Sequence, residues 1–292
     1  MMSLSKILFV GVFDRNKKST NTSQLLAFKK LGCNVIGYNY RDKAAQIGNL
    51  ERDEHLAATV EAGDYDLVVY SKCNQVSENT FQRINNVTKT CLWFMDPLVS
   101  YDAEMRNKTG LVDYFCCDKK NVLSEAIKIN SNSIQICEGY DETVDKPYIL
   151  EKEYDVSFIG NIYGDRLGII TSIDHDIEIF SNVYGAEHAK TVSKSWINLN
   201  FCTNEGASDR VYKIMASGGF LLTNDWVDRE KHFVDKEDLM IFSDINDLNR
   251  KIGECLKNKM LLNKISENGK RKASQFSRTS WAKKMVKFCN EQ

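Results

Sequence analysis

Short apolar runs alternate with amphipathic stretches along the first half of the chain. The run KILFVGVF (6–13) is almost wholly apolar, which is typical of a strand buried on both faces of a parallel sheet. A helix is expected over 20–31, and Gly32 is suited to end it. The same pattern predicts strands at 33–40, 66–71, 90–95, 112–117 and 133–137 and helices at 52–62, 77–86 and 120–129. Such regular alternation indicates an α/β fold with a doubly wound parallel sheet.

The alternation stops in a polar stretch at 138–153, which contains Pro147, and then begins again. The stretch reads as a linker. Further strands are expected at 154–161, 176–182, 196–201, 220–224 and 239–244, with helices at 208–217 and 245–257. The chain is therefore expected to form two Rossmann-like domains, 1–148 and 149–276, that face each other. In such pairs the ligands bind in the cleft, at the carboxyl ends of the strands.

Composition narrows the class of protein. The 292 residues are 42% hydrophobic and 27% charged, as in soluble globular proteins, and no apolar run reaches the roughly 20 residues that a membrane-spanning helix needs. The nine cysteines form no CxxC pair and no Cys/His cluster with zinc spacing. Reduced thiols in a cytoplasmic protein without a structural metal are the simplest account.

The stretch SDRVYKIMASGGFLLTND (208–225) is the strongest candidate for chemistry. Ser208 or Asp209 can cap a helix, which would place Arg210 and Lys213 in its first turn and on one face. Cations at a helix N-terminus oppose the helix dipole, so helix stability does not explain them, whereas a bound diphosphate does. The alternative is that both are solvated or paired with Asp209 and Glu205.

Glycines at strand and helix ends complete this candidate site. Gly160 follows a strand in FIGN, where its lack of a side chain would let a ligand approach the backbone, with Asn161 beside it. Gly218 and Gly219 would allow a similar approach. The structural alternative for this pair is a helix C-cap before a buried strand.

These motifs resemble a known family. RVYKIMASGGFLLT, together with KILFVG, LWFMDP, ICEGYDE, YDVSFIGN and WINLNF in the same order, is similar to the group 1 glycosyltransferases of GT-B fold, in particular the CgeB-like (spore maturation protein) branch. The resemblance extends over much of the chain. It implies a hexosyltransferase with a nucleoside diphosphate sugar, most simply a UDP-sugar, held by the second domain. A glycan, protein or other hydroxyl acceptor would approach from the first domain, and no metal would be obligatory.

The resemblance also suggests roles for individual residues. Related retaining enzymes carry two glutamates eight positions apart, one near the donor sugar and one on the ribose. Glu205 matches the first, but Lys213 stands at the second position, and an ammonium group cannot accept hydrogen bonds from ribose hydroxyls. This departure puts the ribose contact in doubt and leaves retention or inversion open. His188 lies where family members contact the donor base or diphosphate, with a plain surface histidine as the alternative.

An inverting reaction would need a general base for the acceptor hydroxyl. Asp96 in LWFMDP and Asp14 in GVFDRN both follow expected strands and compete for this role, although each could simply cap a turn. The segment 174–176 (DHD) mimics the DxD metal motif of the other large glycosyltransferase fold, but polar residues commonly precede a strand. We therefore expect no metal there.

Charge is distributed unevenly, although the net charge is only −1. The segment 250–292 carries 12 Lys and Arg against three acids, a net charge of +9, which leaves −10 for the rest. Its last part puts Trp281, Met285 and Phe288 on one stripe. Such a basic amphipathic helix can lie on an anionic membrane or on nucleic acid. In GT-B proteins, however, the last helix commonly crosses back onto the first domain, which we expect of 277–292.

Two other functions remain open at this point. The departure at Lys213 would also fit a non-catalytic nucleotide-binding or glycan-binding protein with a decayed site. The basic tail would fit a DNA base glycosyltransferase of the kind found in phages.

Overall fold

The computed structural model describes residues 5–14, 19–162, 164, 166–203 and 205–291. The chain forms two compact units, one made of Met1–Glu138 with Arg278–Gln292 and the other of Gly139–Ser277. The division falls ten residues before the boundary expected from the sequence, because Gly139 and Tyr140 already pack against the end of the second unit. Tyr140 N donates to Phe276 O at 3.1 Å.

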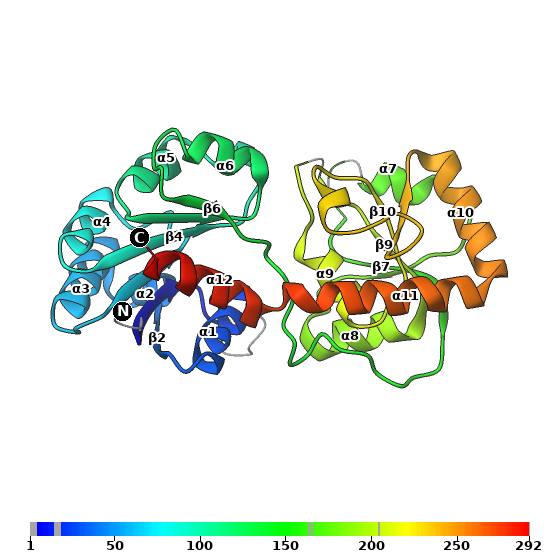
Figure 1. Ribbon diagram of the computed structural model, residues 1–292, viewed down its shortest axis with the longest axis horizontal. Helices are drawn as coiled ribbons and strands as arrows, with labels where there is room; N and C mark the ends of the chain where they lie inside the picture. Colours follow the sequence, from blue (N-terminus) through cyan, green and yellow to red (C-terminus); the bar gives the residue numbers. More distant parts are fainter. Residues whose placement is uncertain (1–4, 15–18, 163, 165, 204, 292) are drawn as a thin grey trace. The chain divides into compact units, whose positions relative to one another are not determined.

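Unit 1 contains a six-stranded sheet in the order β2-β1-β3-β4-β5-β6, with every pair parallel (Figure 1). The strands are β1 (Lys6–Gly11), β2 (Asn34–Asn39), β3 (Leu67–Ser71), β4 (Lys89–Phe94), β5 (Tyr114–Cys117) and β6 (Ser133–Gln135). The central strands are buried on both faces, as their continuous apolar sequences predict.

Helices cover both faces of this sheet. The helices are α1 (Thr20–Lys30), α2 (Tyr40–Ile47), α3 (Asn49–Glu61), α4 (Glu78–Asn85), α5 (Ala103–Gly110), α6 (Lys120–Ala126) and α12 (Arg278–Asn290). One core cluster joins α2–α6 to one face, and a second joins α1 and α12 to the other. Helix α2 follows β2 directly and was not expected, because it carries a single buried residue, Tyr40, and hence no apolar stripe.

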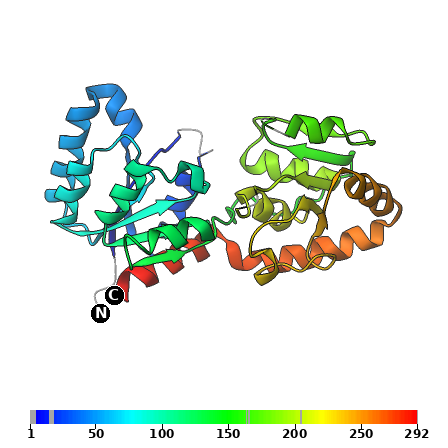
Figure 2. The ribbon, with the colours of Figure 1, turned by 90° about the horizontal axis from the view of Figure 1, so that it is seen from above.

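Unit 2 contains a five-stranded parallel sheet in the order β11-β10-β9-β7-β8. The strands are β7 (Tyr154–Ile159), β8 (Glu178–Phe180), β9 (Ser195–Asn200), β10 (Leu221–Asn224) and β11 (Met240–Phe242). The helices are α7 (Arg166–Thr171), α8 (Gly185–Lys194), α9 (Asp209–Ala216), α10 (Ile245–Lys257) and α11 (Lys259–Ala273). Helices α10 and α11 meet at Asn258, which ends one and caps the other (Figure 2).

Both units are thus doubly wound parallel sheets, which confirms the fold class that the β-α alternation predicts. The apolar stripe of α12 is covered within unit 1: Trp281 and Met285 are buried, and Trp281 packs edge-on against Phe28 and Trp93. Within the described part of the chain, no helix is both long enough and apolar enough to cross a membrane.

Candidate functional site

A pocket of about 280 Å³ lies at the carboxyl ends of the strands of unit 2. The order of the strands reverses at β7, because β8 pairs on one side of it and β9 on the other. Ligands of open α/β sheets bind at such a reversal. The lining residues come from the segments after β7, β8 and β9: Ile159, Gly160, Asn161, Arg166, Asn182, Val183, Tyr184, His188, Asp209, Arg210 and Lys213.

Arg210 is held against the end of β7. Its Nη1 donates to Ile159 O at 3.1 Å, and its guanidinium lies over the ring of Phe158, with 5.7 Å from Cζ to the ring centroid. A Cβ at Gly160 would lie 2.1 Å from Arg210 Nη1. The missing side chain at Gly160 therefore allows Arg210 to lie across the end of β7. The close approach that the sequence predicts at Gly160 is made by Arg210.

Lys213 also lines the pocket, but it lies in the second turn of α9 and not in the first. Ser208 is the N-cap, so Arg210 is the second helical residue and Lys213 the fifth. The Lys213 ammonium forms an ion pair with Asp209 one turn earlier. The pairing with Asp209 that the sequence left open is thus present, and about a quarter of the Lys213 side chain remains exposed.

The N-cap residue of α9 is Ser208, and its side chain makes no capping hydrogen bond to the described part of the helix. The Oγ of Ser208 is buried, bonds to none of the described residues, and does not cap the helix. The first backbone amides of a helix carry no intrahelical partner and attract anions. In α9 the amide of Val211 donates to Ser208 O at 3.1 Å, and Arg210 is the second helical residue.

His188 is a buried polar residue of the pocket lining. It lies in the first turns of α8 with 4% of its surface exposed, and neither ring nitrogen has a hydrogen-bond partner among the described residues. Burial, reinforced by the charges of Lys213 and Arg210 and opposed by Asp209, lowers the pKa of His188 to about 3. The imidazole is therefore neutral at physiological pH, with one N–H to donate, and it lines the pocket.

Arg166 was missed by the sequence analysis. It begins α7, and its guanidinium donates to Asn161 O at 3.1 Å and to Phe201 O at 3.3 Å. The pocket lining that the structure describes thus carries three cations, Arg166, Arg210 and Lys213, and one carboxylate, Asp209. In the sequence Arg166 is marked only by its position after an expected strand. That position does not distinguish a pocket arginine from any other surface arginine.

Other expected site residues lie elsewhere. Gly218 has φ +75° and follows the C-terminal end of α9, and a Cβ on Gly219 would lie 2.4 Å from Val192 Cγ1. Both glycines therefore have structural roles, and neither is among the described residues of the pocket lining. Glu205 is half-buried in the turn before α9, next to the bridge between Thr203 and Gly206, also outside that lining.

The candidates for acid–base and metal chemistry have ordinary contacts. In unit 1, Asp96 follows β4 and its Oδ2 lies 2.5 Å from Lys72 Nζ. Asp14 follows β1 and is half-buried. In the segment 174–176, Asp174 and His175 both bond to Asn249. The described residues contain no group of three or more His, Cys, Asp or Glu placed to hold a metal.

Part of the sequence matches a family model, and the fold is similar to that of known proteins. Residues 147–290 match the family model described as glycosyl transferase-like. Three solved structures are similar over nearly the whole chain. HepE from Anabaena in complex with UDP-glucose has 9% identity and a TM-score of 0.68, with 98% of this chain and 100% of that chain covered. A glycosyltransferase from Rickettsia africae has 12% identity and a TM-score of 0.70, with 98% of each chain covered.

Sucrose-phosphate synthase from Thermosynechococcus elongatus has 11% identity and a TM-score of 0.73, again with 98% of each chain covered. No curated protein matches the sequence. The chain therefore carries a glycosyl transferase-like domain at residues 147–290 and has the two-domain GT-B fold of glycosyltransferases.

Proposed function

We propose that the chain is a cytoplasmic hexosyltransferase that binds a nucleoside diphosphate sugar in the pocket of unit 2. UDP-glucose and UDP are the ligands named for the HepE structures, which makes a UDP-sugar the first donor to test. The sequence motifs favour the CgeB-like branch of the family. The cysteines of the described chain are all free thiols, as expected in a reducing compartment.

The observation that carries this proposal is the neutral, unpartnered His188 among three cations. A buried polar group without a partner is costly, so an unpartnered imidazole in a pocket lining is suited to form a hydrogen bond with a ligand. A diphosphate would accept the imidazole N–H while its charge is matched by Arg166, Arg210 and Lys213. No carboxylate other than Asp209 among the described lining residues opposes it.

The same arrangement favours sugar transfer. Negative charge grows on the diphosphate as its bond to the anomeric carbon breaks, and fixed donors aimed at that charge lower the barrier. Arg210 is preorganised because Ile159 O and the Phe158 ring hold its guanidinium in place. Glu205 would orient the donor sugar, a role that comes from the family resemblance. Asp96 would act as the base toward the acceptor, a role that rests on its place after β4.

A non-catalytic nucleotide-binding protein is the second candidate. It is favoured by Lys213, which stands where related enzymes carry a ribose-binding glutamate and is paired with Asp209. Release of UDP from UDP-glucose above the uncatalysed rate, with water as the acceptor, would contradict this candidate. Its absence with a panel of UDP-, GDP- and ADP-sugars would support it.

Calorimetric titration with UDP tests donor binding directly. Hydrogen bonds to charged groups contribute about 1.5–3 kcal/mol, so Arg210→Ala and Arg166→Ala are each expected to weaken the Kd for UDP about 10- to 100-fold. Arg250→Ala is the matched control, because Arg250 is an exposed arginine of unit 2 that pairs with Glu254 and Asp247. Equal affinities for all four proteins would contradict the proposal.

A further inference from the structure

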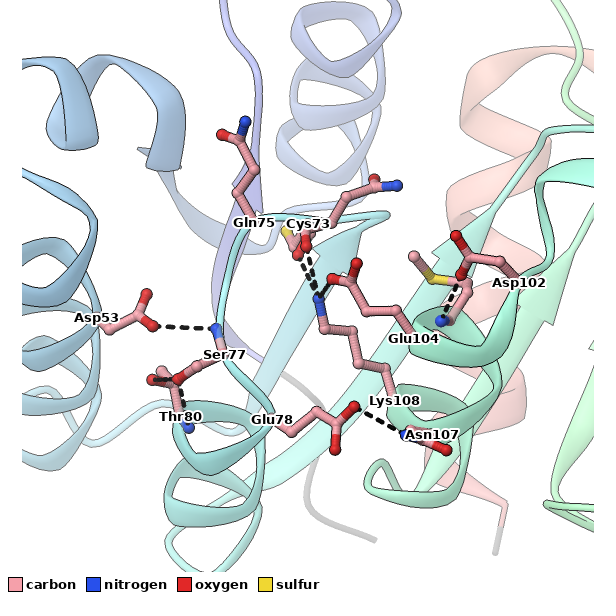
Figure 3. Close-up of polar contacts among 12 residues, drawn as sticks. Asp53, Cys73, Gln75, Ser77, Glu78, Thr80, Asp102, Glu104, Asn107 and Lys108 are labelled. Carbon is pink, nitrogen blue, oxygen red and sulfur yellow. Dashed lines mark hydrogen bonds and ion pairs between the residues drawn. The ribbon is translucent and has the colours of Figure 1, made fainter.

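The loop of residues 72–77, between β3 and α4 in unit 1, is held by two buried cations. Lys108 of α5 is fully buried, and its Nζ donates to Cys73 O and Asn74 O, each at 3.0 Å (Figure 3). Arg52 of α3 is also fully buried and donates to Gln75 O from the other side. Carbonyls of three consecutive residues, 73–75, are thus bound by two cations that come from different helices.

Each cation also pairs with a carboxylate from its own helix. Lys108 pairs with Glu104, and Arg52 Nε lies 2.6 Å from Asp53 Oδ1. The other oxygen of Asp53 accepts from Ser77 N at 3.0 Å, which fixes the end of the loop (Figure 3). Burying Lys108 and the Arg52–Asp53 pair costs solvation free energy, and their hydrogen bonds to the loop offset part of that cost.

The backbone at the start of the loop is strained. Lys72 and Cys73 have φ of 60° and 59°, and neither is a glycine. Two consecutive left-handed residues persist only where the surroundings determine them, and such residues cluster at binding sites. Hydrogen bonds hold this backbone in place: Lys72 N donates to Trp93 O at 3.0 Å, and Cys73 N donates to Ser71 O at 2.8 Å.

Lys72 and Asp96 meet at the carboxyl end of two neighbouring strands. Lys72 follows β3 and Asp96 lies just beyond β4, strands that pair in parallel from Leu67 to Ser71. Lys72 Nζ and Asp96 Oδ2 are 2.5 Å apart, and each side chain is about one third exposed. The pair can therefore be reached by a solute, in contrast to the Arg52–Asp53 pair, whose side chains are 0% and 11% exposed.

We propose that Lys72 and Asp96 form a binding site for a vicinal diol of a carbohydrate acceptor. An ammonium group donates and a carboxylate accepts, and two adjacent hydroxyl groups can satisfy both at once. One hydroxyl donates to Asp96 while the neighbouring oxygen accepts from Lys72. The rigid loop matters because it fixes the ammonium beside the carboxylate before the acceptor arrives. The role as acceptor site rests on the proposed glycosyltransferase function, whereas the binding of a diol does not.

Saturation-transfer NMR with simple methyl glycosides, and without any donor, tests this site. The probes are methyl α-D-glucopyranoside, methyl α-D-mannopyranoside and methyl β-D-galactopyranoside, with N-acetylserinamide as a hydroxyl compound that lacks a diol. We expect saturation of at least one glycoside by the native protein and none of the serine compound. The signal should fall at least tenfold in Lys72→Ala and in Asp96→Asn, and Lys72→Arg should retain part of it.

Lys128→Ala is the matched control, because Lys128 forms an exposed ion pair with Glu125 in the same unit. It should leave the glycoside signal unchanged. Denaturation midpoints of the Lys72 and Asp96 variants within the range of this control would show that the fold is kept. A glycoside signal that survives Lys72→Ala, or no glycoside signal at all, overturns the site. A UDP titration on the same samples separates this outcome from a failure of the donor pocket, since neither residue lines that pocket.

Discussion

Gly160 and Arg210 show how a single residue can control the pocket of unit 2. The guanidinium occupies the space that a Cβ at position 160 would need. Gly160→Ala is therefore expected to displace Arg210 from Ile159 O and to weaken UDP binding about tenfold, or about 1.4 kcal/mol, in a calorimetric titration.

Gly168→Ala is the control for this change. Gly168 lies in α7, and nothing comes within 4 Å of the Cβ that the substitution would add. Alanine also favours a helix over glycine, so stability should hold or rise slightly. A Kd for UDP that Gly160→Ala leaves unchanged would show that the position of Arg210 does not matter for binding.

His188 and Asp145 make opposite contributions to the pH dependence of unit 2. The pKa of His188 is lowered to about 3, mainly by burial, so between pH 4 and 6 the unfolded chain binds a proton there that the folded chain does not. Burial raises the pKa of Asp145 to about 6, so over the same range the folded chain holds the extra proton. The first effect makes stability rise with pH and the second makes it fall, each by about 1.4 kcal/mol per pH unit.

Single variants should reveal each contribution. Relative to the native protein, His188→Gln is expected to make the stability of unit 2 fall as pH rises from 4 to 6, and Asp145→Asn to make it rise. Urea denaturation at half-unit pH steps measures both slopes. Parallel pH profiles for the three proteins would contradict the assignment of these groups.

The sequence alone predicted some of the individual residues that line the pocket. Arg210 was found because a cation near a helix start needs an explanation, and Gly160 because it follows a strand. Arg166 and the unpartnered state of His188 could not be predicted, since both depend on the packing of loops separated by dozens of residues. Gly218 and Gly219 were misplaced because a helix C-cap and a phosphate loop have the same glycine signature.

Among the elements, α12 makes the clearest link between distant parts of the sequence. Trp281 lies between Phe28 of α1 and Trp93 of β4. Trp281→Ala would leave a cavity in this core and is expected to cost unit 1 about 3–5 kcal/mol in urea denaturation.

Lys283→Ala is the control, because Lys283 lies on the exposed side of the same helix. It should change the free energy of unfolding by no more than about 0.5 kcal/mol. Similar losses for both variants would show that α12 is bound through its charges and not through its apolar stripe.

Strands were predicted better than helices because buried strands have unbroken apolar sequences. The expected strands at 66–71 and 220–224 agree with β3 and β10 within one residue. Helices α2 and α7 each bury a single residue, so little periodic signal marks them. Lys213 was expected in the first turn, but it is the fifth helical residue with Ser208 as the N-cap and would be the fourth with Asp209, so it lies beyond the first three positions with either cap.

On the scale of the whole molecule, the two units have separate cores and should respond separately to ligands. UDP at about 100 times its Kd is expected to stabilise unit 2 by about 2.7 kcal/mol, which raises its Tm by about 5–10 °C. Differential scanning calorimetry should therefore show one transition that moves with UDP and one that does not. If UDP changes the Tm of neither transition, or raises both Tm values equally, the result would contradict a site built from unit 2 alone.

The overall fold could be predicted because β-α alternation and a polar linker are both visible in the linear sequence. The boundary between the units could not be predicted, because it depends on the hydrogen bond from Tyr140 N to Phe276 O, between residues far apart in sequence. The basic charge of 250–292 suggested a surface partner. The structure instead gives part of that segment a packing role, through the buried stripe of α12.

A crystal structure of the protein soaked with UDP would test the central claim most directly. The account predicts diphosphate density in the pocket of unit 2, in contact with Arg166, Arg210 and the ring of His188, at the uncapped N-terminus of α9. Density for the diphosphate elsewhere, with His188 still unpartnered and the two arginines directed into solvent, would contradict it.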